Sequence, residues 1–195
     1  MEYQQLIALI TFAFVSTVSP GPNNIMLMTS GANVGFMRTI PHMLGITFGF
    51  SLMVFLVGFG LMGLFTAYPI IQQSLRIVSM MYLVYLAFKI AKSKSMTSEV
   101  SDYTPMTFMS AACFQWVNPK AWTMALTAIS VYASSTAQQD ILIVSLIFGC
   151  VNVPSVSLWT AAGKKLQTLL QVPARIKIFN YCMAGLLIGS IVPMV

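Results

Sequence analysis

Ser19-Pro20-Gly21-Pro22-Asn23-Asn24 interrupts an otherwise apolar run that extends from Leu6 to about Met28. The two prolines have no backbone N–H and their rings clash with preceding carbonyls, while the glycine adds backbone freedom, so an undisturbed helix cannot continue here. Inside a bilayer, irregular backbone persists only against protein or a polar cavity. The stretch is therefore interpreted as a broken membrane helix that lines a solute site, with a proline kink packed against neighbouring helices as the alternative.

The composition indicates a membrane protein. The 195 residues are 57% hydrophobic and only 7% charged, whereas a soluble domain has roughly 25% charged residues. The net charge of +6 comes from lysines and arginines that lie between the apolar runs. That placement is a topology signal, so nucleic acid is not expected as a partner. The chain is predicted to be an all-α integral protein of the lipid bilayer.

Six stretches are long enough to cross the bilayer, since a span needs about 20 apolar residues. They are residues 3–30, 43–65, 69–91, 106–132, 140–162 and 174–195. A polar linker over 92–105 leaves three spans on each side, in halves of about 1–91 and 105–195. Because three is odd, the halves must enter the membrane in opposite directions. The prediction is one transmembrane domain, residues 1–195, built from two inverted three-helix halves with helices 1 and 4 broken near mid-membrane.

The basic residues predict the orientation of these spans. The connections after spans one, three and five hold eight lysines and arginines, against one on the opposite side. The positive-inside rule therefore places both termini outside the cytoplasm and the 92–105 linker inside it. The eight are Arg38, Lys89, Lys92, Lys94, Lys164, Lys165, Arg175 and Lys177, and the one is Arg76.

Polar residues at the predicted mid-membrane depth form the candidate site. Asn118-Pro119-Lys120 breaks the fourth span as the prolines break the first, and Asn152 lies at the centre of the fifth. Polar groups at this depth are expensive against lipid, so they are expected to converge inward. The predicted substrate-binding residues are Pro20, Gly21, Pro22, Asn23, Asn24, Gln115, Asn118, Pro119, Lys120 and Asn152.

A half-helix that starts at Pro22 would direct its first N–H groups and the positive end of its dipole at the cavity, which suits a carboxylate. Lys120 is interpreted as a second carboxylate partner or a charge that moves during coupling. The alternative is a lysine that snorkels, or that bonds to carbonyls freed by Pro119. Asparagine and glutamine oxygens can accept hydrogen bonds from an ammonium group. No Asp or Glu lies at mid-span, so proton antiport through Lys120 or Asp140 and facilitated efflux both stay open.

Two motifs resemble the signatures of the lysine exporter (LysE/RhtB) family. They are Ser19-Pro20-Gly21-Pro22-Asn23 in the first span and Gln115-Trp116-Val117-Asn118-Pro119-Lys120-Ala121 in the fourth. The likeness covers essentially the whole chain, and Pro154 departs from it. The resemblance implies a multi-pass exporter of amino acids or their derivatives in the bacterial inner membrane. It is closer to the neutral-substrate branch (homoserine, threonine, cysteine, O-acetylserine); export of basic amino acids or other small solutes is the alternative.

Other classes of protein fit less well. Cys113, Cys150 and Cys182 fall in separate apolar runs and are expected to be buried, like small hydrophobic residues. A membrane thiol-disulfide carrier is disfavoured because the first span has no cysteine. One histidine and no acid inside the spans argue against an enzyme, and neither metal nor cofactor is expected. Gly45 and Gly49 predict close helix packing within one subunit, with a homodimer interface as the alternative.

Overall fold

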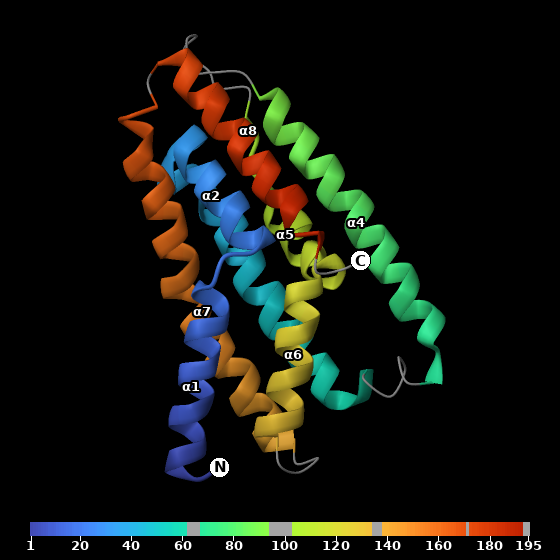
Figure 1. Ribbon diagram of the computed structural model, residues 1–195. Coiled ribbons are helices and arrows are strands. Elements are labelled where there is room, and N and C mark those ends of the chain that lie inside the picture. The colour runs from blue at the N-terminus through green and yellow to red at the C-terminus, as the bar shows by residue number, and fades with distance from the viewer. Residues whose placement is uncertain (62–66, 94–102, 134–137, 171, 193–195) are drawn as a thin grey trace.

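The computed structural model describes residues 1–61, 67–93, 103–133, 138–170 and 172–192, and its described regular structure is all helical (Figure 1). The α-helices are α1 (Tyr3–Val18), α2 (Pro22–Leu56), α4 (Pro69–Lys92), α5 (Phe108–Phe114), α6 (Pro119–Tyr132), α7 (Gln138–Gln167) and α8 (Pro173–Gly189). A π-helical turn, η1 (Val57–Leu61), follows α2, and a 3₁₀ turn, η2 (Gln115–Val117), follows α5. The predicted linker over 92–105 lies largely outside the described residues.

Both predicted breaks are present. Gly21 separates α1 from α2 with an extended backbone (φ −178°, ψ 177°), and Asn118 separates η2 from α6 (φ −94°, ψ 110°). Pro22 and Pro119 each occupy the first position of the helix that follows, where a missing N–H costs nothing. In Figure 1, α1 continues upward into the start of α2, whereas α5 continues downward into α6. The two broken helices therefore run in opposite directions.

The segment between the first two predicted spans, residues 31–41, was expected to be a short connection, and this prediction is wrong. The chain is helical on both sides of Gly35, which alone reverses its direction with φ 79° and ψ 176°. A positive φ of this size is open to glycine and strained for other residues, so one residue replaces a loop. The second part of α2 then descends beside the first, although Pro41 lies inside it (Figure 1).

Two other predicted boundaries also shift. The fifth helix was expected to end near Ala162, but α7 continues to Gln167 and buries Gly163. Lys164 and Lys165 lie in its last turn, where basic residues interact favourably with the negative end of the helix dipole. The last helix was expected to reach Val195, yet α8 ends at Gly189.

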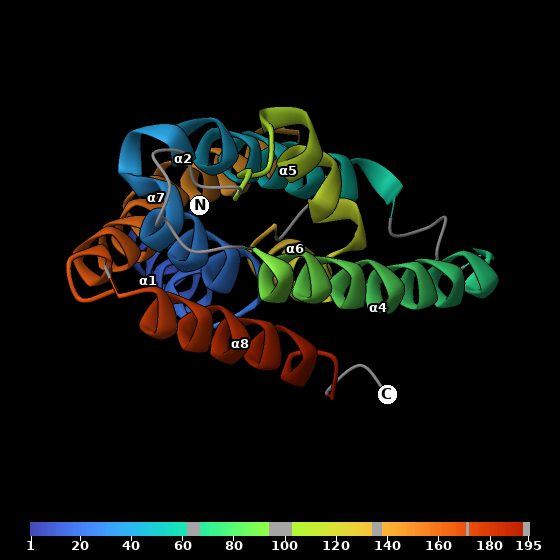
Figure 2. The same cartoon turned by 90° about the horizontal axis from the view of Figure 1, so that it is seen from above.

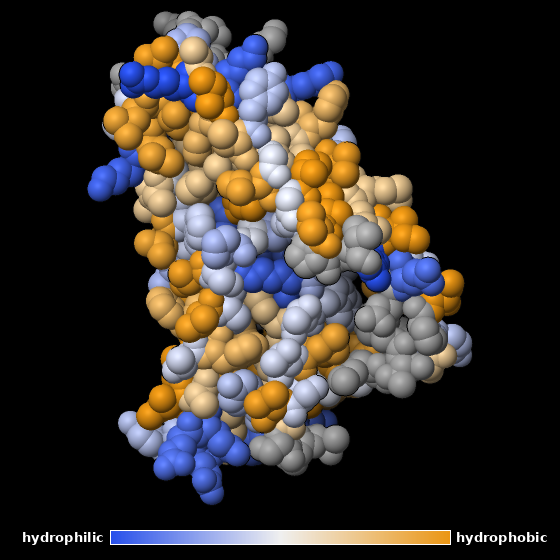
Figure 3. All heavy atoms as spheres, viewed as in Figure 1, coloured by the Kyte–Doolittle hydropathy of each residue, from blue (hydrophilic) through white to orange (hydrophobic). Residues whose placement is uncertain are grey.

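Three helical stretches are long and apolar enough to cross a membrane: 22–61, which contains the reversal at Gly35, 73–92 and 138–167. Two shorter helical stretches, α1 and Phe108–Val117, are also apolar. Figure 3 shows hydrophilic residues at both ends of the molecule and many apolar residues between them, with a hydrophilic area near the middle of this face. These features indicate a multi-pass membrane protein, while the six-span arrangement in inverted halves stays a prediction.

The core forms where α2 packs along α7, with α5 and α1 against the same pair and α4 against α8. Figure 2 shows α4 and α8 on one side of the bundle. The three cysteines are exposed rather than buried, so the core excludes them. A Cβ on Gly45 would overlap the Phe108 carbonyl oxygen, and one on Gly49 would lie 2.5 Å from the Ala112 Cα. The glycine spacing therefore serves packing within one chain, as expected.

The helices α2 and α7 approach each other closely at Gly31 and Gly163. A Cβ on Gly31 would overlap the Thr160 carbonyl oxygen, and a Cβ on Gly163 would overlap that of Met28. Both obstacles are backbone atoms, which cannot rotate aside. Only a residue without a side chain lets the two helices approach this closely.

We expect Gly163→Leu to destabilise the protein by more than about 2 kcal/mol, at the upper end of what overpacking costs, because the two backbones must separate. Gly185→Leu is the matched control, since a Cβ there meets no atom within 4 Å. Thermal unfolding of the detergent-purified variants measures both. Equal melting temperatures would contradict the packing role of Gly163.

Candidate functional site

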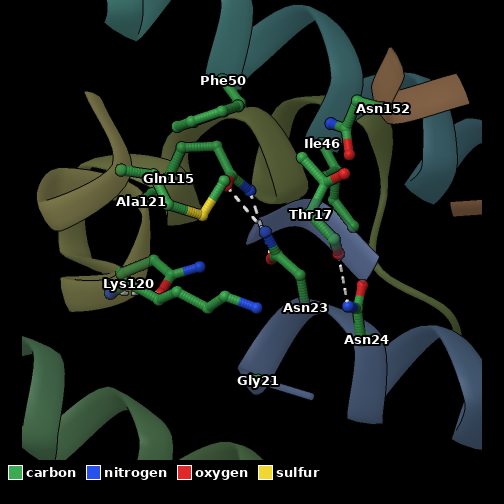
Figure 4. Close-up of a pocket in the computed structure, with 12 residues that line it drawn as sticks. Thr17, Gly21, Asn23, Asn24, Ile46, Phe50, Gln115, Lys120, Ala121 and Asn152 are labelled. Atoms are coloured by element: carbon green, nitrogen blue, oxygen red, sulfur yellow. Dashed lines mark hydrogen bonds between the residues drawn. The ribbon is translucent and has the colours of Figure 1, made fainter. Parts of the chain in front are cut away.

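A pocket lies between the two helix breaks, and five parts of the chain line it (Figure 4). It is partly open to the outside and has a cavity volume of about 30 Å³. The lining residues are Thr17, Gly21, Asn23, Asn24, Ile46, Phe50, Gln115, Asn118, Lys120, Ala121, Met124 and Asn152. Seven of the ten residues predicted from the sequence are among them. Pro20, Pro22 and Pro119 do not line the pocket but set where the flanking helices end and begin.

Side chains from other helices satisfy the carbonyls that α1 leaves free at its end. Asn24 Nδ2 donates to the carbonyls of Thr17 (2.7 Å) and Ser19 (2.9 Å). Trp159 Nε1, from α7, donates to the carbonyl of Val18 at 3.0 Å. Each helix end leaves such acceptors unpaired, and burial makes them costly. The first break is therefore held by donors from elsewhere in the fold.

The ammonium group of Lys120 belongs to the same set of donors. Its Nζ lies 2.5 Å from the Ser19 carbonyl oxygen, 2.8 Å from the Ser19 Oγ and 3.4 Å from the Pro20 carbonyl oxygen. The alternative in which this lysine bonds to carbonyls freed by Pro119 is wrong, because its acceptors come from the opposite break. A cation at the C-terminal end of α1 also interacts favourably with the helix dipole. Among the described residues, no carboxylate forms an ion pair with Lys120.

A reciprocal pair of amides links the two breaks directly. Asn23 Nδ2 donates to Gln115 Oε1 at 2.8 Å, and Gln115 Nε2 donates to Asn23 Oδ1 at 3.3 Å. The Gln115 side chain is fully buried and also donates to the Ala111 carbonyl at 2.8 Å. Figure 4 shows the pair spanning the pocket. It connects the start of α2 to η2, so it must be broken if these elements separate.

Two helix starts meet at this pocket with different capping. Asn118 Oδ1 caps α6 by accepting the Lys120 N–H at 3.1 Å. Gly21 has no side chain to cap α2, and within the described residues the N–H groups of Asn23 and Asn24 have no hydrogen-bond partner. Unpaired donors and the positive helix end make the α2 start an anion-binding element. Binding of a carboxylate at this position stays a prediction.

Four apolar residues that also line the pocket were not predicted. Ile46 and Phe50 come from α2, and Ala121 and Met124 come from α6. Apolar residues within apolar spans carry no distinguishing signal in the sequence. The available clue was spacing, since Met124 lies four residues after Lys120 and such positions share a helix face. The pocket thus combines charged and amide groups with apolar side chains.

We expect Asn24→Leu to lower the free energy of unfolding by about 1–3 kcal/mol, the cost of leaving a buried polar group unpaired. Two carbonyls of the first break would lose their donor while side-chain volume stays similar. Thr123→Val is the control, because its hydroxyl bonds to the Pro119 carbonyl on an exposed face of α6. Denaturation in detergent micelles reports the difference. An Asn24→Leu protein as stable as Thr123→Val would show that the cap is dispensable.

Comparison with known proteins adds to this geometry. The family model of the LysE type translocator matches residues 14–191. A cysteine/O-acetylserine efflux protein of Klebsiella pneumoniae subsp. pneumoniae is 27% identical over 186 residues, 93% of this chain and 92% of the relative. The Escherichia coli K12 protein of the same name is 26% identical over 163 residues, 83% of each chain. No solved structure matches significantly. The match extends over nearly the whole chain and includes both helix breaks, so this protein belongs to the LysE type translocator family.

Proposed function

We propose that the protein exports small neutral amino acids or their derivatives, such as cysteine and O-acetylserine, as a secondary transporter of the bacterial inner membrane. The observation that carries the proposal is the pocket between the breaks, where the uncapped start of α2 and the Lys120 ammonium lie beside apolar side chains. Its family and the names of its relatives support efflux of an amino acid rather than an enzymatic reaction.

The two ends of a zwitterion have matching partners in this pocket. A carboxylate would accept hydrogen bonds from the free N–H groups of Asn23 and Asn24 and from the Lys120 ammonium. The substrate's own ammonium would replace Lys120 at the Ser19 and Pro20 carbonyls, which already hold a group of the same chemistry. Binding would then exchange one ammonium for another at the end of α1.

The lining favours neutral over basic side chains. A second cationic group would need an anionic partner once it leaves water, and the pocket lining contains no Asp or Glu. Ile46, Phe50 and Met124 offer instead an apolar surface to a short side chain. We therefore propose neutral substrates and retain basic amino acids as the alternative that the export assay decides.

Substrate entry requires the pocket to open. Its cavity of about 30 Å³ is far below the ~300 Å³ at the lower end of small-molecule pockets. The Asn23–Gln115 pair and the bonds from Lys120 to Ser19 hold its walls together, so they would separate during transport. We propose that the two inverted halves rock about this point, with both termini periplasmic, which reporter fusions after α8 can test.

Efflux of labelled solutes from cells with and without the protein tests this proposal. We expect faster export of O-acetylserine, cysteine, homoserine or threonine and no change for lysine or arginine. Acceleration of lysine or arginine alone would overturn the neutral-substrate assignment. No acceleration of any amino acid, with the protein present in the membrane, would overturn the proposed function.

We expect Lys120→Gln to reduce export by at least about tenfold, equivalent to about 1.4 kcal/mol, while the protein still inserts. Glutamine can donate to the Ser19 carbonyl but carries no charge for a carboxylate. Lys120→Arg should restore export only in part, because the planar guanidinium does not replace a compact ammonium. Lys177→Gln, an exposed lysine on α8, is the control. Unchanged export by Lys120→Gln would show that this lysine serves the helix end alone.

A further inference from the structure

Three residues outside the pocket have a buried side-chain polar atom without a hydrogen-bond partner in the described part of the chain: His42, Ser51 and Ser155. The His42 side chain is 0% exposed, and neither of its ring nitrogens has a partner. Ser155 is 1% exposed, and its hydroxyl is likewise unpaired. His42 and Ser155, unlike Ser51, each directly follow a proline inside a helix, Pro41 in α2 and Pro154 in α7. The same uncommon arrangement thus occurs on both helices of the central pair.

His42 in α2 and Ser155 in α7 each lie about one helical turn from a residue that lines the pocket. Ile46 and Asn152 line the pocket. His42 lies four residues before Ile46 in α2, and Ser155 lies three residues after Asn152 in α7. Positions three or four apart share a helix face, so both side chains follow the pocket wall. They lie on its Gly35 side, because the second part of α2 runs from Gly35 past His42 to Ile46.

The packing of α2 on α7 places these two residues at the same level. Ser145 Oγ donates to the Ser51 carbonyl at 2.8 Å, and Ile46 and Asn152 both line the pocket. The two helices therefore pack antiparallel, and following α2 backward and α7 forward from these contacts leads to His42 and Ser155. Met43 and Val156, the next residues after His42 and Ser155, belong to one hydrophobic cluster. This antiparallel register puts His42 and Ser155 at a similar level on the two facing helices.

An unpaired imidazole and an unpaired hydroxyl are expensive in a dry core. Leaving a buried polar group without a partner costs about 1–3 kcal/mol in proteins, and native structures contain few such groups. Apolar residues would fill these positions more favourably if packing were their only role. Buried polar groups of this kind are commonly satisfied by water. Prolines weaken both helices beside them by removing a backbone hydrogen bond, which eases local opening.

We propose that His42 and Ser155 form a second polar layer of the solute path, which fills with water when the pocket opens toward the Gly35 end of the bundle. Water then occupies their free hydrogen-bonding positions, and a polar solute passes this layer between the pocket and that end. The identity of the solute rests on the proposed function; the hydration of the layer does not.

Cysteine accessibility tests the hydration. In a background with Cys113, Cys150 and Cys182 replaced by alanine, Ser155→Cys in lipid nanodiscs is treated with a small cationic methanethiosulfonate reagent. Val156→Cys is the matched control, because it is the next residue, 2% exposed, and lies in the apolar cluster. We expect Ser155→Cys to react at least about tenfold faster than Val156→Cys. The reagent reacts with the thiolate, which forms readily in water and is disfavoured in apolar surroundings. Equal, slow reaction of both would overturn the proposal. If Ser155→Cys does not accumulate, His42→Cys decides the question in the same way.

Export measurements test the role of the layer in passage. His42→Leu should lower O-acetylserine export several-fold at equal protein level, whereas His42→Gln, which keeps hydrogen-bonding groups, should retain most of it. Wild-type export by His42→Leu would contradict a role in the path. A reactive Ser155→Cys in a protein that exports no amino acid would leave the hydrated layer standing and overturn the proposed function alone.

Discussion

The structure depends on pairing the backbone carbonyls that the first helix break exposes. At the end of α1, the carbonyls of Thr17, Val18 and Ser19 are reached by side-chain donors from α2, α7 and α6 respectively, with Ser19 also bound by Asn24. Without water, each unpaired group would cost several kcal/mol. The break is therefore stable only where these helices come together. The helix break caused by the prolines therefore requires the arrangement of the surrounding helices.

The breaks themselves could be predicted from the sequence, because proline acts through its own covalent structure. Pro22 and Pro119 begin helices in the structure as their missing N–H groups dictate. The convergence of Asn23, Gln115 and Lys120 could also be predicted, because polar groups that face lipid are energetically costly. Seven of the ten expected residues line one pocket for this reason.

Other features could not be predicted, because they arise from contacts between distant segments. Nothing near Lys120 in the sequence shows that its acceptors lie at Ser19, about a hundred residues away. Gly35 and Gly163 resemble other glycines of the chain, yet one reverses it and the other allows close helix contact. The apolar pocket residues, such as Phe50, were missed for a similar reason, since they are those of any membrane helix.

The partners of Lys120 also bear on how a site of this kind can work. A buried ion pair with a carboxylate would be hard to separate, because removing one partner of such a pair costs about 3–5 kcal/mol. Hydrogen bonds from a charged group to neutral acceptors contribute about 1.5–3 kcal/mol, and the Ser19 and Pro20 carbonyls are neutral. They hold the ammonium in place without neutralising its charge. Under the proposed function, a substrate carboxylate would interact with that charge, while the substrate ammonium would bond to the carbonyls that Lys120 leaves.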